Sequence, residues 1–419
     1  MDDGKETPPA DKEKKSSGEG AGIRLPEVLL HDAYEKMSKA ELASAAGIFE
    51  DVLKRFNSNL PDDQRSLIHS ELGTLYYWLG DYEAGKHHCE RALAFSDHND
   101  QAYNILGKIA VAQFQFPKAR GYFSKISDDN PARPLGMCLV SIKLRDRNGV
   151  DIFLKEAHGK IPSPSTHPEY GVYHAYSMLL KGDAKSAVSQ ARNFIKRCER
   201  DPSLLLIIAE IFMTVGNYGE ARSTVEKVQK SCPENDQTFA ILAHSAYAQE
   251  DWGEADSYAR DAVRFNSANA YAKTILMKLA TRNGNYAAAE EIGMQILQDS
   301  PEYSLGHANL GDVYFNQGRY ELSEIEYDQT QQLMNADTKG ARLRKARMKF
   351  IKSDFAGAAE ILEELVGGYH TYYDDAMCDL VLCYDQIGDE EKKSEMLDKM
   401  AFRRSFYHRT EKILKSFGE

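Results

Sequence analysis

The densest group of basic side chains lies in Thr338–Lys352, which holds seven lysines and arginines and no acidic residue. On a helix, an apolar packing face would consist of Leu343, Ala346 and Phe350. A separate basic face would consist of Arg342, Lys345, Lys349 and Lys352. Like charges at helical spacing repel by roughly 0.2–0.5 kcal/mol per pair, so this face needs acidic partners. Two interpretations stay open: the stretch binds an acidic ligand, or it pairs with neighbouring acidic residues such as Glu321, Glu324 and Glu326.

Residue types with catalytic or metal-binding chemistry form no recognisable motif. The sequence has no H-E-x-x-H, no G-x-x-x-x-G-K-[ST], no G-x-S-x-G and no kinase signature. His87-His88-Cys89 is a dense group of metal-capable residues, but adjacent helical residues point about 100° apart and cannot jointly hold one ion. Cys89 is expected in the core instead. We therefore predict no enzyme, no metal site and no cofactor.

The elements that must position these residues repeat with one period. The turn glycines Gly80, Gly182, Gly216, Gly284 and Gly318 are 102, 34, 68 and 34 residues apart. Multiples of 34 also separate Ala119, Ala187, Ala221, Ala255 and Ala289, and the prolines Pro131, Pro233 and Pro301. Glycine ends a helix in the left-handed conformation, and the Asp or Asn after it can cap the next helix. The pattern predicts an all-α chain of helical hairpins.

The stretch Ser304–Asp337 shows the repeating unit most fully. Leu310-Gly311, Tyr314 and Tyr327 fall where the W-x2-L-G-x2-Y…A-x3-F…P pattern places them. In these residues the chain resembles the tetratricopeptide repeat (TPR) family. The resemblance implies a right-handed α-solenoid of stacked antiparallel helical hairpins, the TPR superhelix, in which each unit contacts mainly its neighbours.

The chain divides into three expected parts. Residues 1–25 are charged and rich in Gly, Pro and Ser, and are predicted to be a disordered tail. Residues 26–400 are expected to form the TPR array, with about ten or eleven hairpins, weakest at 134–167 and at both ends. The unit at 134–167 has Asn148-Gly149 as its predicted turn and ends in a proline-rich segment, 161–168. We interpret this segment as a long connection between hairpins; the alternatives are a hinge, or an exposed loop that a kinase or a partner recognises. Residues 401–419 are expected to form a C-terminal capping helix, which we favour over a membrane-surface helix.

The bulk composition narrows the setting. The formal charge is 52 − 64 = −12, which argues against a general nucleic-acid or anionic-membrane surface. No apolar run approaches the ~20 residues that span a bilayer. The six cysteines form no C-x-x-C pair. A cytoplasmic protein with reduced thiols, no membrane insertion and no nucleic-acid partner is expected.

The TPR resemblance also implies candidate binding residues. TPR grooves that hold a peptide carboxylate use Lys, Asn and Arg from the first helices of three successive repeats. Asn309 and Arg344 fall at two of those positions and Lys278 lies one turn from a third, whereas the other clamp positions, at Thr274, Gly340 and Leu343, do not match. With the basic stretch included, the predicted peptide-binding residues are Lys278, Asn309, Arg342, Arg344 and Arg347.

The expected function follows from the absence of catalytic motifs and from the resemblance. It is a non-catalytic adaptor or scaffold that binds an acidic or C-terminal peptide of a partner protein on its concave face. One alternative is a structural subunit of a large assembly or a homo-oligomer. An enzyme-regulatory chain is the less favoured alternative.

Overall fold

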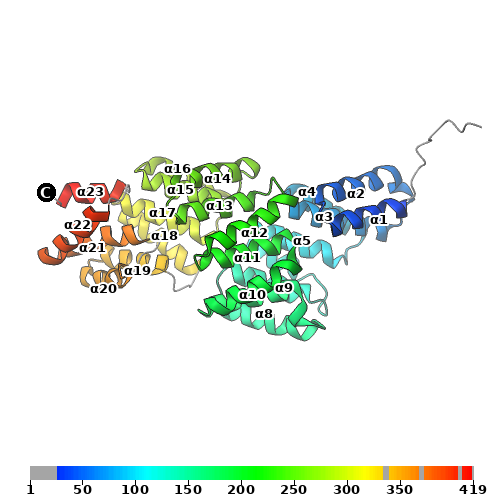
Figure 1. The fold of residues 1–419 in the computed structure, drawn as a ribbon, viewed down its shortest axis with the longest axis horizontal. Helices are drawn as coiled ribbons and strands as arrows, with labels where there is room; N and C mark the ends of the chain where they lie inside the picture. The colour runs from blue at the N-terminus through cyan, green and yellow to red at the C-terminus, as the bar shows by residue number, and fades with distance from the viewer. Residues whose placement is uncertain (1–25, 334–338, 368–371, 404–407, 418–419) are drawn as a thin grey trace, which may run out of the picture.

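The structure is a computed structural model that describes residues 26–333, 339–367, 372–403 and 408–417. Within these ranges every regular element is a helix (Figure 1). The predicted tail, 1–25, lies outside the described residues. The described helices include none that is long and apolar enough to cross a membrane.

The first half of the chain contains α1 (Pro26–Ser38), α2 (Leu42–Phe56), α3 (Asp62–Leu79), α4 (Tyr82–Phe95), α5 (Asp100–Ala112), α6 (Phe116–Phe123), α7 (Ala132–Lys143), α8 (Arg147–Lys160), α9 (Pro168–Leu180), α10 (Ala184–Ile195) and α11 (Pro202–Thr214). The second half contains α12 (Tyr218–Ser231), α13 (Asp236–Ala248), α14 (Trp252–Phe265), α15 (Ala270–Arg282), α16 (Tyr286–Asp299), α17 (Ser304–Gln317), α18 (Tyr320–Leu333), α19 (Lys339–Ile351), α20 (Phe355–Leu365), α21 (Tyr373–Ile387), α22 (Glu390–Arg403) and α23 (His408–Phe417). Three short 3-10 helices are η1 (Asn57–Asn59), η2 (Pro164–Thr166) and η3 (Lys196–Cys198).

Consecutive helices pack as antiparallel hairpins, α1 with α2 and so on to α21 with α22. The five predicted turn glycines all have positive φ, from 74° at Gly284 to 90° at Gly80. Most second helices are capped as predicted; Asp81 Oδ1, for example, accepts a hydrogen bond from Ala84 N at 3.0 Å. Where glycine is absent, other residues accept the left-handed conformation, such as Phe114 with φ 58°. The predicted all-α fold of stacked hairpins is confirmed.

The hairpin in 134–167 differs from the prediction. Its turn is not at Asn148-Gly149 but three residues earlier, where Arg145 has φ 54°. Asp146 then caps α8 by accepting a hydrogen bond from Gly149 N at 3.0 Å. A Cβ at Gly149 would lie 2.5 Å from Ser141 Oγ, so this glycine serves close helix packing rather than the turn. In the proline-rich 161–168, only the 3-10 helix η2 and the start of α9 are helical.

In several hairpins a side chain of the second helix packs on a glycine of the first helix. A Cβ at Gly311 would lie 2.6 Å from the Tyr327 ring, and a Cβ at Gly107 would lie 2.4 Å from the Phe123 ring. In α3/α4 the same position is taken by Cys89, which is fully buried as predicted.

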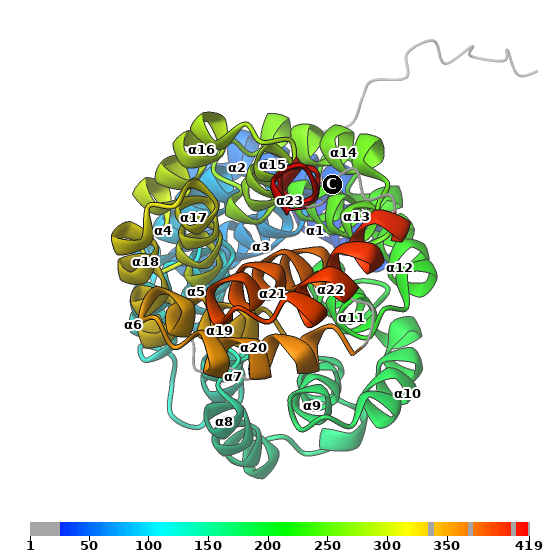
Figure 2. The same cartoon turned by 90° about the vertical axis from the view of Figure 1, so that its left-hand side faces the viewer.

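The hairpins wind into a superhelix, seen from the side in Figure 1 and along its axis in Figure 2. In Figure 2 the chain circles anticlockwise while it approaches the viewer, from α5 through α9, α13 and α17, so the superhelix is right-handed. Its coils touch: Asn235 Nδ2 donates to Trp78 O at 3.1 Å, and the rings of Phe114 and Tyr303 lie 4.3 Å apart. Inside the first coil, Lys108 of α5 pairs with Glu169 of α9 at 2.9 Å.

Candidate functional site

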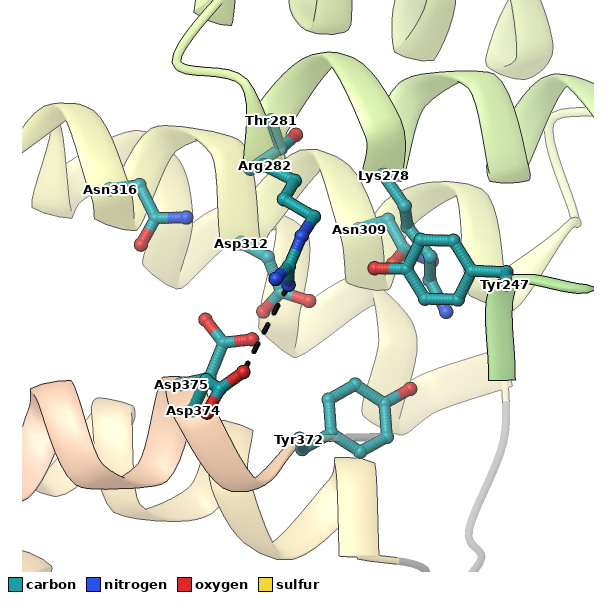
Figure 3. A pocket seen from close by; sticks show the side chains of 10 residues that line it. All are labelled: Tyr247, Lys278, Thr281, Arg282, Asn309, Asp312, Asn316, Tyr372, Asp374 and Asp375. Carbon is teal, nitrogen blue, oxygen red and sulfur yellow. Dashed lines mark ion pairs between the residues drawn. The ribbon is translucent and has the colours of Figure 1, made fainter. Parts of the chain in front are cut away.

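A pocket opens inside the C-terminal part of the superhelix, between the inner helices α15 and α17 and the start of α21 (Figure 3). Its cavity volume is about 50 Å³, which suits a small polar group or a few water molecules. The lining residues are Tyr247, Lys278, Thr281, Arg282, Asn309, Asp312, Asn316, Tyr372, Asp374 and Asp375. Because first helices face the inside of the superhelix, this lining comes from successive repeats.

Lys278 is a half-buried cation in this lining. Its Nζ lies 5.5 Å from the ring centroids of both Tyr247 and Tyr372. No carboxylate of a described residue forms an ion pair with it. Its charge acts on neighbouring groups: it lowers the pKa of the Tyr372 phenol against the opposing effect of burial. Burial, with added repulsion from Lys278, lowers the pKa of His244 to about 3. The pocket therefore has a positive wall made of one ammonium and two tyrosine rings.

Asn309 and Arg282 are two further polar residues of the lining. Asn309 is buried, and its Nδ2 donates to Leu305 O at 2.6 Å. An amide nitrogen has two protons, so one remains for a ligand. Arg282 stacks 4.0 Å from the Trp252 ring and lies 4.0 Å from Asp374 on the opposite wall (Figure 3).

Behind the pocket lies a buried cluster of arginines and aspartates. Arg344 Nη2 donates to Asp312 Oδ2 at 2.6 Å. Arg347, only 1% exposed, bonds Asp312 Oδ1 at 2.8 Å, Asp375 Oδ1 at 2.9 Å and Asp379 Oδ2 at 2.7 Å. Burial alone would raise the pKa of the Asp312 carboxyl, but Arg344 and Arg347 outweigh it and lower the pKa. The Asp312 carboxylate is thus held charged within the fold.

The predicted binding residues are therefore partly brought together. Lys278 and Asn309 line the pocket, and Arg344 borders it, since its guanidinium lies 5.8 Å from the Tyr372 ring. Arg347 is enclosed by its three aspartates. Arg342 lies on the exposed face of α19 and pairs with Glu364 at 3.2 Å.

The basic stretch is mostly paired within the chain, but largely not with the expected residues. Of the three suggested acidic partners only Glu324 pairs with it, through Lys352 at 3.3 Å. Glu326 instead binds His307, with 2.6 Å between the carboxylate and Nδ1. The other partners are aspartates of α17 and α21 together with Asp354 and Glu364.

Several lining residues were missed in the sequence. Tyr372 and Asp374 come from a degenerate repeat whose register is shifted by about a residue, so no motif position pointed to them. Asp375 and Asp379 could have been recognised in the sequence as partners of the basic stretch. Two acidic residues on one helical face repel each other, and here they oppose the basic residues of the preceding first helix.

In the His87-His88-Cys89 group, Cys89 is buried in the hairpin core, His88 is half-buried and His87 is exposed. His88 Nδ1 lies 3.0 Å from His69 Nδ1, and its ring stacks on Tyr76. Burial lowers the pKa of His69 to about 4, with a further contribution from His88. Within the described ranges, no three His, Cys, Asp or Glu side chains are grouped so that they could hold a metal ion.

Comparisons with known proteins give structural likenesses only. No protein-family model matches the chain, and no curated protein matches it in sequence. Among solved structures, it is similar to yeast Tom70 at 12% identity, over 94% of each chain with a TM-score of 0.40. It is also similar to the human IFIT1 dimer with m7Gppp-AAAA, at 12% identity over 91% of each chain with a TM-score of 0.48. Similarity to MamA, at 16% identity, covers 38% of this chain and 93% of that one with a TM-score of 0.29.

At identities this low and TM-scores below 0.5, these likenesses imply nothing about partners or activity. The architecture rests on the helices themselves, which pair, repeat and wind as described. The chain is a helical-repeat protein with an α-solenoid fold.

Proposed function

We propose that this chain is a TPR-type, non-catalytic adaptor or scaffold that binds a carboxylate of a partner protein's peptide in the pocket around Lys278. The observation that carries the proposal is the half-buried Lys278 ammonium, which contacts two tyrosine rings and forms no ion pair with a described carboxylate. Removing an ammonium from water is costly unless an anion compensates it. A carboxylate in the pocket would supply that compensation.

The surroundings favour a single carboxylate on an extended peptide. The cavity of about 50 Å³ holds one small group, so the rest of a peptide would lie along the inner helices. The second Asn309 amide proton could donate to a carboxylate oxygen, and charge-assisted bonds of this kind are stronger than neutral ones. Arg344 would act mainly by its charge, since Asp312 already engages its guanidinium at 2.6 Å.

The test uses a fluorescein-labelled peptide, Gly-Ser-Gly-Asp-Glu-Asp, with a free C-terminal carboxylate. Its affinity is measured by fluorescence anisotropy at two ionic strengths. Lys278→Ala is expected to weaken binding by about 10-fold or more, because a hydrogen bond to a charged group contributes about 1.5–3 kcal/mol. Higher salt should also weaken it.

The matched control is Lys345→Ala, because Lys345 is an exposed lysine on α19 with no ion pair to a described residue. It should change the affinity less than twofold. A C-terminally amidated peptide tests whether the terminal carboxylate, rather than a side chain, is bound. Equal affinity for wild-type protein and Lys278→Ala would contradict the proposed site.

A structural role in an assembly is the second candidate function. It is favoured by exposed apolar side chains on the outer helix α18, where Leu322 is 37% and Ile325 55% exposed. Light scattering would decide between a monomeric adaptor and a self-associating subunit. If the chain self-associates through this face, Ile325→Asp should return it to a monomer.

A further inference from the structure

The last described helix, α23, lies across the inner face of α21. Thr410 and Ile413 are buried there, and Thr410 Oγ1 lies 3.7 Å from Cys378 Sγ. At the start of the helix, Arg409 Nη2 lies 2.5 Å from Asp379 Oδ1 and Nη1 lies 3.7 Å from Asp375 Oδ1. Arg409 is therefore the ionic anchor of α23.

The first residue of α23, His408, contacts the turn between α15 and α16. The His408 ring lies 6.3 Å from the Tyr286 ring at the start of α16. A Cβ at Gly284 would lie 2.7 Å from His408 Cδ2, so the two segments are in close contact. Figure 2 shows α23 at the near end of the superhelix. The helix thus joins α21, which supplies Asp375 to the pocket, to the end of α15, which supplies Arg282.

We propose that α23 is a displaceable strap that ties these two walls together and restricts access to the pocket. This proposal rests on the proposed function, because the ligand whose access is restricted is the carboxylate peptide. In the docked state α15 and α21 are held at a fixed separation. In the released state the inner face of α21, with Cys378, is open to solvent.

Two features of α23 favour release. It has ten residues, fewer than the ~12–15 that an isolated helix needs to be even marginally stable, so its helicity depends on docking. When Arg409 leaves, Asp375 and Asp379 each keep one ion pair, because both retain Arg347 at 2.9 Å and 2.7 Å. The carboxylates stay paired in both states.

The strap is tested by the reactivity of Cys378, which is fully buried beneath α23. The native protein is treated with iodoacetamide, and the labelling rate of each cysteine is measured by mass spectrometry. Arg409→Gln should speed labelling of Cys378 at least tenfold and leave Cys89 and Cys138, which lie in distant hairpins, unchanged. An unchanged rate at Cys378, or equal acceleration at all three cysteines, would overturn the strap.

A measurement on the unmodified chain guards against a variant that misfolds. In hydrogen–deuterium exchange, the amides of α23 should exchange at least tenfold faster than those of α21 in Tyr373–Ile387. Equal protection of the two helices would show that they open together, which also overturns the strap.

The link to the pocket is tested by locking α23. Thr410→Cys places a second thiol beside Cys378, and oxidation with copper phenanthroline joins the two. The locked form should bind the Gly-Ser-Gly-Asp-Glu-Asp peptide at least fivefold more weakly than the same variant after reduction. Equal affinities would refute the restriction of access. No binding to either form would count against the proposed function, whereas the labelling and exchange rates would still decide the strap.

Discussion

Arg347 and Arg342 lie on the same helix, α19, and present a sharp test of the physical reasoning. Arg347 is 1% exposed and bonds three aspartates, so Arg347→Ala leaves buried carboxylates short of their counter-ion. Removing one partner of a buried ion pair costs about 3–5 kcal/mol. The Arg342–Glu364 pair is 44% and 67% exposed, so Arg342→Ala should cost no more than about 1 kcal/mol.

The assay is urea unfolding followed by far-UV circular dichroism and by tryptophan fluorescence. Repeat arrays need not unfold in one step, so the transition is assigned to the C-terminal hairpins by hydrogen exchange in α19 and α21. Arg347→Ala should remove most of the protection in these helices, and Arg342→Ala should leave it within a factor of about five, the equivalent of about 1 kcal/mol. Equal losses in the two variants would refute the claim that burial sets the cost.

The ion pair between Arg347 and Asp312 predicts that the stability of the C-terminal hairpins depends on pH. The pKa of Asp312 is lowered in the folded state, so its stabilising contribution is present above its unfolded pKa and is lost as the pH falls through the folded pKa. Arg347→Ala removes one of the two guanidinium groups responsible, and the pKa of Asp312 should rise. Acid unfolding of the C-terminal hairpins should then begin at a higher pH than in wild-type protein. An unchanged acid transition would show that Arg347 does not hold Asp312 charged.

Two further predictions concern the hairpin cores. Gly311→Ala should destabilise the α17/α18 hairpin by about 1–3 kcal/mol, because the added Cβ would lie 2.6 Å from the Tyr327 ring. The control is Gly121→Ala on α6, where the added Cβ meets nothing within 4 Å. Thermal unfolding should show this control to be as stable as the wild-type protein or more stable. The pKa of His69 is lowered from 6.5 to about 4 in the folded chain, so the unfolded chain binds a proton at a higher pH than the folded chain does. The free energy of unfolding should therefore fall as the pH drops from 6.5 towards 4. His69→Gln should make this fall smaller, as measured by urea titrations at several pH values.

The fold was predictable from the sequence because its signals are local. Gly80 and Gly318 end helices in the left-handed conformation that their spacing predicted. The error at Asn148-Gly149 arose because Asn-Gly usually marks a turn, and the cap by Asp146 outweighed it. The turn signal of Asn148-Gly149 and the capping signal of Asp146 lie within four residues of each other. The role of Gly149 becomes clear only in the structure, where Ser141 Oγ leaves no room for a Cβ at this position.

The candidate site was less predictable because it depends on which side chains are enclosed. Arg342 and Arg347 look alike in sequence, yet one faces solvent and the other is surrounded by three aspartates. Tyr372 and Asp374 reach the pocket only because the superhelix brings α21 opposite α15. That approach is a long-range property, which repeat spacing alone does not contain.

The contacts between coils have a mechanical consequence. In a solenoid whose repeats contact only their sequence neighbours, a stretching force separates one interface between repeats at a time. Here the bond from Asn235 to Trp78 and the contact between Phe114 and Tyr303 tie one coil to the next. Stretching this molecule must first break those ties, so under load it should behave as a stiff rod that lengthens abruptly rather than as an elastic coil.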